Sequence, residues 1–128
     1  MKTKKVLVSV LAGAISLGLL AGCSGNDGTT TDSAEKKYQV GVVQFAPHPS
    51  LDNCYEGFVQ GLKQEGFEEG KNLRIDFQNA QGEFATASQI SAKFTSDKKD
   101  LILGIATPAA QAAYNAAEGK VPVVYSAV

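Results

Sequence analysis

The residues best suited to chemistry in this chain lie at the end of a short apolar run. Leu101–Ile105 has the composition of a strand buried on both faces of a parallel sheet, and Ala106, Thr107 and Pro108 lead from it into an Ala-rich run. We expect Thr107 to be the N-cap of a helix and Pro108 its first residue. Free N–H donors at such a helix start suit an anion such as a carboxylate. The alternative is that the pair only caps the helix.

More binding-type residues are expected nearby, because the carboxyl ends of parallel strands meet at one edge of a sheet and ligands bind there. Backbone N–H donors, a hydroxyl and an aromatic wall suit a small zwitterion with an apolar side chain. Two alternatives stay open, since Phe45 is equally suited to the core and His48 to the surface. The residues delivered to this edge are Gln44, Phe45, His48 and Pro49 from the first strand, Ala106, Thr107 and Ala109 from the third, and Ser126 and Ala127 from the fourth.

Enzyme motifs are missing from the sequence. The single histidine, His48, lies between two prolines, and no Ser stands in a nucleophile elbow. Neither GxGxxG nor GxxxxGK[ST] is present, so no nucleotide cofactor is indicated. Cys54 has no clustered His, so we expect a core thiol rather than a zinc ligand. We therefore expect no catalytic residue, no metal and no cofactor in this chain.

Composition and charge exclude two further classes. The chain has 128 residues, of which 44% are hydrophobic and 20% charged, enough for one small domain. Without Lys2, Lys4 and Lys5, which we expect to be removed, nine basic residues remain against thirteen acidic ones, a net charge of −4. This balance gives no basic footprint for nucleic acid and no Lys/Arg-rich helix for a membrane surface.

The first residues have the pattern of an export signal. Residues 1–22 contain three lysines, an apolar run over Val6–Leu20 and small residues, as in a secretory signal peptide. The following Leu-Ala-Gly-Cys resembles the lipobox of bacterial lipoproteins, which implies a diacylglycerol on Cys23 and residues 23–37 as a lipidated, flexible tether. The protein would then be extracytoplasmic and lipid-anchored to the cell membrane. The alternatives are a permanent N-terminal anchor or a chance tetrapeptide.

Strands and helices are expected to alternate through the folded part. Such alternation predicts parallel strands with right-handed crossovers, an α/β class with a doubly wound, Rossmann-like sheet. Alternating apolar and polar residues over Leu73–Gln78 place that strand at a sheet edge. The expected strands are Tyr38–Phe45, Leu73–Gln78, Leu101–Ile105 and Val121–Ser126. The first expected helix runs from about Leu51 to Leu62, and the third runs from Pro108 to about Glu118. The second contains Ala87, Ile90 and Phe94 on its apolar face and ends near Asp97.

The first helix carries several local signals. Ser50 or Asp52 is expected to cap its start, and Gly66 is a suitable C′ residue. Gly57 and Gly61 are four residues apart on one helix face, so we expect them to mark a close approach of the helix to the sheet.

Four stretches carry a family resemblance: GVVQFAPHPSLD, EGFVQGLKQEGFEEGKNLRIDFQNAQG, IATPAAQAA and VPVVYSAV. They resemble ABC-transporter substrate-binding lipoproteins of the type I periplasmic-binding-protein fold, in particular the family of tryptophan and other aromatic amino-acid binders. In that family two α/β lobes close on the ligand. The resemblance implies that residues 38–128 are a partial N-terminal lobe, with the second lobe absent from this sequence.

The resemblance also implies roles at the carboxyl edge. Thr107 and the N–H groups at Ala109 and nearby would hold the carboxylate of an amino acid. Ser126 and Ala127 would help from the fourth strand, and the Phe45–Pro49 loop would wall the side chain.

The expected function is a non-enzymatic substrate-binding subunit of an ABC importer. Its partners would be a small-molecule ligand, an ABC permease subunit and the membrane, through the diacylglycerol. Alternatives are a lipid-anchored α/β enzyme or a ligand-presenting sensor whose key residues lie beyond Val128. An aromatic amino acid is favoured as ligand by resemblance alone, and branched-chain amino acids and unrelated small molecules remain open.

Overall fold

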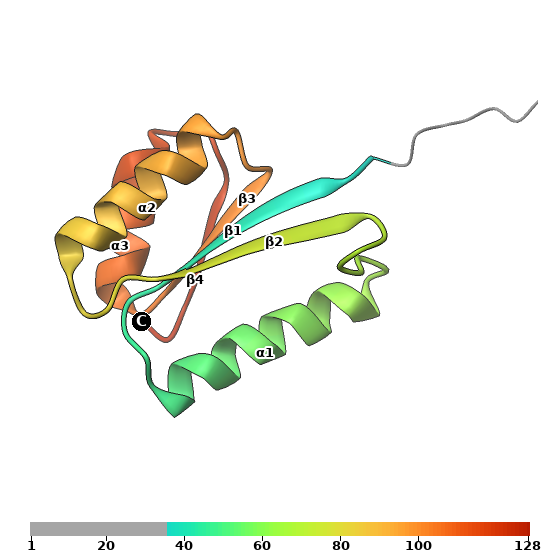
Figure 1. Cartoon of the computed structure of the whole chain (residues 1–128), viewed down its shortest axis with the longest axis horizontal. Helices are drawn as coiled ribbons and strands as arrows, with labels where there is room; N and C mark the ends of the chain where they lie inside the picture. The colour runs from blue at the N-terminus through green and yellow to red at the C-terminus, as the bar shows by residue number, and fades with distance from the viewer. Residues whose placement is uncertain (1–35) are drawn as a thin grey trace, which may run out of the picture. The chain divides into compact units, whose positions relative to one another are not determined.

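A parallel sheet with helices on both faces forms the part of the chain that the computed structural model describes, residues 36–128 (Figure 1). The strand order is β2-β1-β3-β4, which confirms the α/β, doubly wound class and the place of β2 at an edge. The predicted signal peptide and Cys23 lie outside the described residues. The elements are β1 (Tyr38–Gln44), α1 (Pro49–Gln64), β2 (Leu73–Asn79), α2 (Phe84–Ser96), β3 (Leu101–Ile105), α3 (Thr107–Ala117) and β4 (Val123–Ser126).

The helices divide between the two faces because the chain reverses its direction across the sheet once. It passes from β1 to β2 through α1, then back over β1 to β3 and on to β4 through α2 and α3. Right-handed crossovers therefore place α1 on one face and α2 and α3 on the other (Figure 1). None of the helices within residues 36–128 is long and apolar enough to cross a membrane.

Each face has its own apolar cluster. The α1 face buries residues that alternate along β1 and β3, and half-buried side chains of α1 cover them. The opposite face is filled by the small residues of α3 and by Phe94. The buried members are Val40, Val42, Leu73, Leu103 and Ile105 on the α1 face, and Val43, Ala80, Ala87, Phe94, Ile102, Ala109, Ala112, Ala113, Ala117 and Val121 on the other.

Two strand glycines allow helices to lie directly on the sheet. A Cβ on Gly104 would stand 2.6 Å from the backbone Cα of Ala110, and one on Gly41 would stand 2.5 Å from the Phe94 ring. Because backbone atoms of α3 occupy the space above Gly104, this glycine fixes where α3 begins relative to the end of β3.

The start of α1 differs from the sequence prediction. His48, not Ser50 or Asp52, is the N-cap: its Nδ1 accepts a hydrogen bond from the N–H of Ser50 at 3.2 Å. The helix then begins at Pro49, where a missing N–H costs nothing. An imidazole nitrogen here takes the role that Ser, Thr, Asp or Asn usually fills.

The prediction for the C-terminal end of α1 is confirmed, and the prediction for its two glycines is wrong. Gly66 (φ +87°) is the C′ residue, and Phe67 N–H donates to Leu62 O at 2.9 Å, which completes a Schellman motif. Gly57 and Gly61 do not approach the sheet, because no atom of another element lies within 4 Å of a Cβ built on either. The helix contacts the sheet instead through its larger apolar side chains, which hold it away from the strands.

Candidate ligand site at the carboxyl edge of the sheet

The candidate site lies where the loops that follow β1 and β3 diverge. These two strands are neighbours, but α1 leaves β1 on one face and α3 leaves β3 on the other (Figure 1). Such a switch point opens a crevice at the carboxyl ends of the strands, the usual ligand position in open α/β sheets. The structure thus brings the predicted residues of the β1 and β3 loops to one edge of the sheet, and Ser126, at the end of β4, is in register with Ile105 of β3.

The start of α3 has N–H groups without an acceptor. Thr107 is the first helical residue and Ala106 is the N-cap, so the prediction that Thr107 caps the helix is wrong. The Thr107 side chain makes no capping hydrogen bond, and Pro108 has no N–H to donate. Among the described residues, no hydrogen bond is formed by the N–H of Thr107 or Ala109, whereas Ala110 N–H donates to Ala106 O at 2.9 Å. Thr107 is exposed, whereas Ala109 is fully buried.

Ala106 takes an unusual backbone conformation to make this start. Its φ of +77° and ψ of 151° belong to a region that glycine normally occupies, at a cost of about 1–3 kcal/mol for other residues. The conformation is held from two sides, since Ala106 N–H donates to Ser126 O at 3.0 Å and Ala106 O accepts from α3. The helix therefore begins one residue earlier than predicted, because Ala106 completes the turn that a side-chain cap would otherwise provide.

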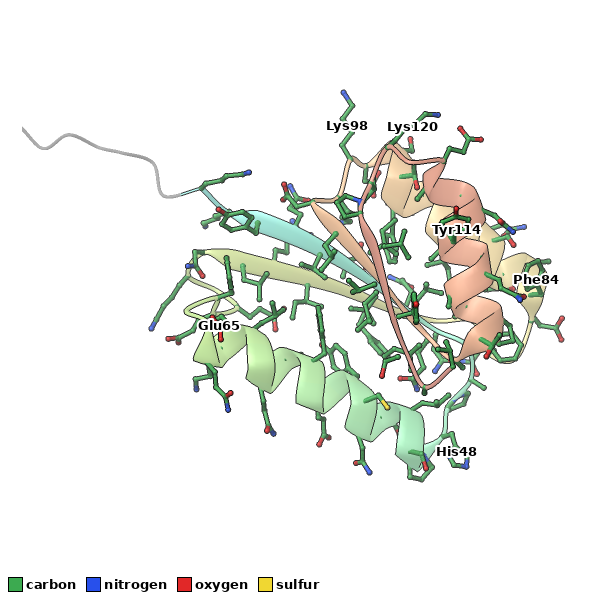
Figure 2. All side chains as sticks on the ribbon, turned by 180° about the vertical axis from the view of Figure 1, so that it is seen from behind. His48, Glu65, Phe84, Lys98, Tyr114 and Lys120 are labelled. Carbon is green, nitrogen blue, oxygen red and sulfur yellow. The ribbon has the colours of Figure 1, made fainter. Side chains whose placement is uncertain are left out.

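The loop after β1 is tied to its neighbours on both sides. Phe45 N–H donates to Ile105 O at 3.1 Å, and Gly82 N–H donates to Phe45 O at 2.7 Å. The Phe45 ring is half-buried against the apolar cluster on the α2 and α3 face. This agrees with the alternative in which Phe45 belongs to the core. His48 and Pro49 are exposed, and the His48 ring lies at the start of α1 (Figure 2).

Residues at the end of β4 complete the edge. Ser126 is half-buried and Ala127 is exposed with φ +56°. The Ser126 hydroxyl forms no hydrogen bond within residues 36–128. Register places Ser126 beside Ile105, and Ile105 beside Gln44, so the three share a row across the sheet.

Gln44 is an edge residue for which no individual role is predicted from the sequence. It is 0% exposed, and its Nε2 donates to Ala46 O at 3.0 Å and to Asp52 Oδ1 at 2.8 Å. Its Oε1 is buried and has no hydrogen-bond partner. The signal available in the sequence was one polar residue at the end of the otherwise apolar β1 stretch that begins at Val40.

Charged side chains are distributed unevenly between the two ends of the sheet. Every Lys and Arg in residues 36–128 lies before a strand, near the start of β2 or toward the end of a helix, and Figure 2 shows Lys98 and Lys120 at the opposite end from His48. The carboxyl edge has carboxylates, Asp52 in the first turn of α1 and Glu83 at the N-cap of α2. An anionic group bound here would depend on backbone N–H groups and hydroxyls, because this edge of the described chain has no Lys or Arg.

A hollow of about 400 Å³ adjoins this edge between α3 and β4. Thr107 lines it together with the exposed aromatic rings of Tyr114 and Tyr125. A larger hollow, of about 700 Å³, lies at the amino end of the sheet beside Lys98, Lys99 and Lys120. We place the candidate site at the carboxyl edge, because the unpaired N–H groups and the switch point of the sheet are there.

Comparison with known proteins agrees with this fold. The chain is 44% identical over 133 aligned residues to a tyrosine-binding protein of Clostridioides difficile strain R20291, covering 99% of this chain and 38% of that protein. A ligand-free, open structure of a substrate binding protein with adhesive properties from Clostridium difficile matches with a TM-score of 0.66 and 48% identity, over 69% of this chain and 30% of that one.

A second solved structure contains an amino acid. It is an ABC domain from Streptococcus pneumonia in complex with L-Trp, with a TM-score of 0.66 and 38% identity over 70% of this chain and 30% of that one. The chain thus spans less than two fifths of the length of these relatives. The family model for ABC transporter substrate binding proteins matches residues 39–128, almost all of the described part. The chain belongs to the family of ABC transporter substrate binding proteins.

Proposed function

We propose that this chain is the ligand-binding lobe of an extracytoplasmic substrate-binding lipoprotein that captures an amino acid, with an aromatic one favoured, for an ABC permease. The observation that carries the proposal is the start of α3, where unpaired N–H groups lie beside the switch point of the sheet. A carboxylate is the ligand group that best satisfies such donors.

The other edge residues take supporting roles in this proposal. Thr107, with the N–H of Ala109 and the turn through Pro108, receives the carboxylate. Ser126 and Ala127 border it from β4, and Phe45, His48 and Pro49 form the wall on the β1 side. The names of two relatives, one tyrosine-binding and one solved with L-Trp, support an aromatic side chain.

Ligand binding is tested with the 128-residue chain by calorimetry against L-tyrosine, L-tryptophan, L-leucine, adenine and ribose. The chain has no Trp, so a bound tryptophan supplies the only indole fluorescence. We expect an aromatic amino acid to bind most tightly. Heat and fluorescence changes absent for every compound would contradict the proposal.

The role of α3 is tested by Thr107→Val, which removes one hydroxyl without changing the shape of the side chain. Loss of a hydrogen bond to a charged ligand group predicts roughly tenfold or greater weakening of amino-acid binding. Thr86→Val is the matched control, since Thr86 lies in the first turn of α2 and makes no described hydrogen bond. Equal affinities for both variants would remove Thr107 from the site.

The membrane anchor is tested separately through Cys23. Labelled palmitate should enter the wild-type protein in a bacterial host, and Cys23→Ser should take up none. Equal labelling of both proteins would exclude Cys23 as the lipidation site.

A further inference from the structure

A second unpaired polar atom lies at the carboxyl edge of the sheet, at the end of β1 rather than at the start of α3. Gln44 is fully buried at the end of β1, and its Oε1 accepts no hydrogen bond. A buried acceptor without a donor lowers the stability of the fold, so such an atom calls for a physical reason.

The orientation of the Gln44 amide is fixed by its partners. Both groups that Nε2 contacts are oxygens, the carbonyl of Ala46 and Oδ1 of Asp52. Exchanging the amide oxygen and nitrogen would set Oε1 against these two acceptors and lose both hydrogen bonds. Oε1 therefore remains an acceptor, and the described part of the chain supplies no donor for it.

The surroundings of Oε1 favour a cationic donor. Asp52 is exposed, and because the two ends of an amide are about 2.2 Å apart, Oε1 lies within about 5 Å of Asp52 Oδ1. A single ammonium group can donate to two oxygens at that separation. No Lys or Arg of residues 36–128 lies at this edge to compensate the charge of Asp52.

We propose that Gln44 Oε1 and the Asp52 carboxylate form the subsite for a protonated amine of the ligand. In this subsite Asp52 supplies the charge, and Gln44 holds Asp52 through Nε2 while Oε1 receives one ammonium N–H. The proposal rests on the proposed function and deepens it: the donors at α3 and the acceptors at Gln44 and Asp52 form the two ends of a zwitterion site.

The pairing has a consequence for specificity. A ligand with a carboxylate but no amine would leave Oε1 without a donor and bring a negative charge toward Asp52. The edge should therefore select α-amino acids over the corresponding desamino acids, since leaving a buried polar group unpaired discriminates strongly between ligands.

The test compares Asp52→Asn with Glu83→Gln in the full chain. Asn at position 52 keeps an oxygen for Gln44 Nε2, so the helix start is preserved while the charge is removed. Binding of L-tyrosine and of its desamino analogue, 3-(4-hydroxyphenyl)propionate, is measured by calorimetry. We expect Asp52→Asn to weaken tyrosine binding about 10- to 100-fold and to leave the desamino analogue unaffected or slightly tighter. Glu83→Gln should change both less than threefold.

A second readout follows the subsite directly. The side-chain NH₂ signals of Gln44, assigned by their loss in Gln44→Met, should shift in NMR spectra when tyramine is added, because tyramine carries the amine without the carboxylate. The desamino analogue should leave these signals in place.

The outcomes separate the two proposals. Tyrosine binding that is unchanged in Asp52→Asn, or weakened equally for tyrosine and its desamino analogue, would overturn the amine subsite and leave the proposed function standing. Absence of any tyrosine heat, tryptophan fluorescence change or tyramine-induced shift in the wild-type chain would overturn both.

Discussion

The two ends of the sheet differ in whether their polar groups have partners within the chain. At the amino end, charged side chains pair with one another: Lys71 contacts Glu68 at 2.9 Å, Lys120 contacts Glu118 at 2.7 Å, and Lys36 lies 3.8 Å from Asp100. At the carboxyl end, the N–H groups at the start of α3 and Oε1 of Gln44 have no partner in the described chain. The polar groups of the amino end are thus paired within the chain, whereas the carboxyl end has donors and an acceptor without a partner in residues 36–128, as the proposed ligand site requires.

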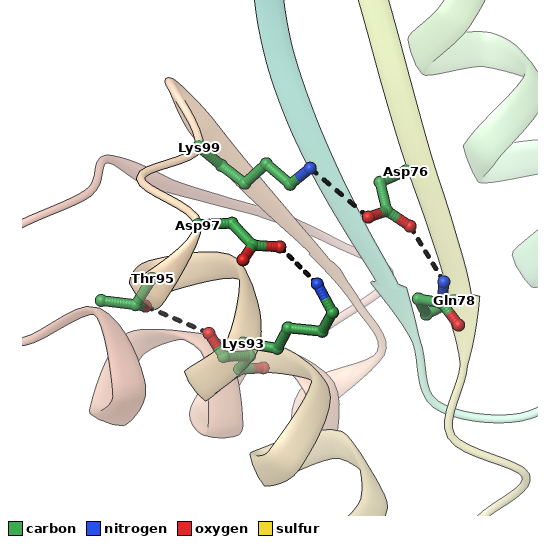
Figure 3. Close-up of polar contacts among 7 residues, drawn as sticks. Asp76, Gln78, Lys93, Thr95, Asp97 and Lys99 are labelled. Carbon is green, nitrogen blue, oxygen red and sulfur yellow. Dashed lines mark hydrogen bonds and ion pairs between the residues drawn. The ribbon is translucent and has the colours of Figure 1, made fainter.

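The most buried pair of the amino half illustrates the first kind (Figure 3). The Lys99 side chain is 5% exposed, and its Nζ lies 3.4 Å from Asp76 Oδ2 and 5.7 Å from the centre of the Phe94 ring. Gln78 Nε2 donates to Asp76 Oδ1 at 2.9 Å. Lys93 and Asp97 form a separate, exposed ion pair on α2 (Figure 3). The comparison therefore predicts that substitutions at the amino half lower stability, and that substitutions at the carboxyl edge act on binding.

The largest effect is expected at Gly104, which sets the contact between the sheet and α3. Gly104→Ala places a Cβ 2.6 Å from the backbone of Ala110, so the start of α3 must move away from β3. We expect the free energy of unfolding to fall by about 3 kcal/mol, as measured by urea titration. Since the unpaired N–H groups move with the helix, amino-acid binding should be lost as well.

Gly57→Ala is the matched control for this substitution. A Cβ at Gly57 meets open space, and alanine is the better helix former by about 1 kcal/mol, so this variant should be more stable than the wild type. A Gly104→Ala variant with wild-type stability would mean that α3 is free to shift, and the positioning argument would be wrong.

The next effect is expected at the amino half. Asp76→Asn removes the counter-charge of Lys99, whose side chain is almost fully buried. We therefore expect the free energy of unfolding to fall by about 2 kcal/mol. Asp97→Asn, which breaks only the exposed pair with Lys93, should cost less than about 0.5 kcal/mol. Neither variant should change ligand affinity in the folded protein. Equal stability losses for the two would show that the burial of Lys99 has no energetic consequence.

The same contrast predicts a pH dependence. The hydrogen bond from Gln78, with a smaller contribution from the Lys99 ammonium, holds the pKa of Asp76 below its ordinary value of 3.8. Because the pKa is lower in the folded than in the unfolded state, this stabilisation is present above the ordinary value and is lost as the pH falls through the folded-state pKa. The difference in unfolding free energy between wild type and Asp76→Asn should therefore shrink below about pH 4. A gap that stays constant down to pH 2 would contradict the assignment.

Much of the fold could be predicted from the sequence because hydrophobic periodicity and glycine placement are local signals. β3 was predicted with its observed bounds, and the C′ role of Gly66 was predicted from its type and position. The cap at His48 was missed because an imidazole is not among the usual N-cap groups. The prediction that Gly57 and Gly61 face the sheet was wrong, because their spacing places them on one helix face but does not say what that face contacts.

The location of the candidate site could be predicted from the sequence, but the hydrogen bonds between its residues could not. Parallel strand ends meet at one edge, so the grouping of the Phe45, Thr107 and Ser126 loops followed from the order of elements. The pairing of Gln44 with Asp52 depends on how β1 and α1 lie against each other, and the positive φ of Ala106 depends on its hydrogen bond to Ser126. Both arise from contacts between separate elements, which no local pattern encodes.

A smaller effect than at Gly104 or Asp76 is expected at Ala106, and it has the opposite sign. Glycine adopts the Ala106 conformation without strain, and although glycine loses more chain entropy on folding, Ala106→Gly should raise the unfolding free energy by about 1 kcal/mol. Thermal and urea unfolding measure this gain, and calorimetry with L-tyrosine measures its effect on binding. If the strained residue serves to hold the α3 start ready for a carboxylate, the more stable variant should bind less tightly, because relaxing the turn allows the unpaired N–H groups to reorient. A variant that gains stability and keeps full affinity would show that the strain at Ala106 is a property of the β3–α3 junction alone.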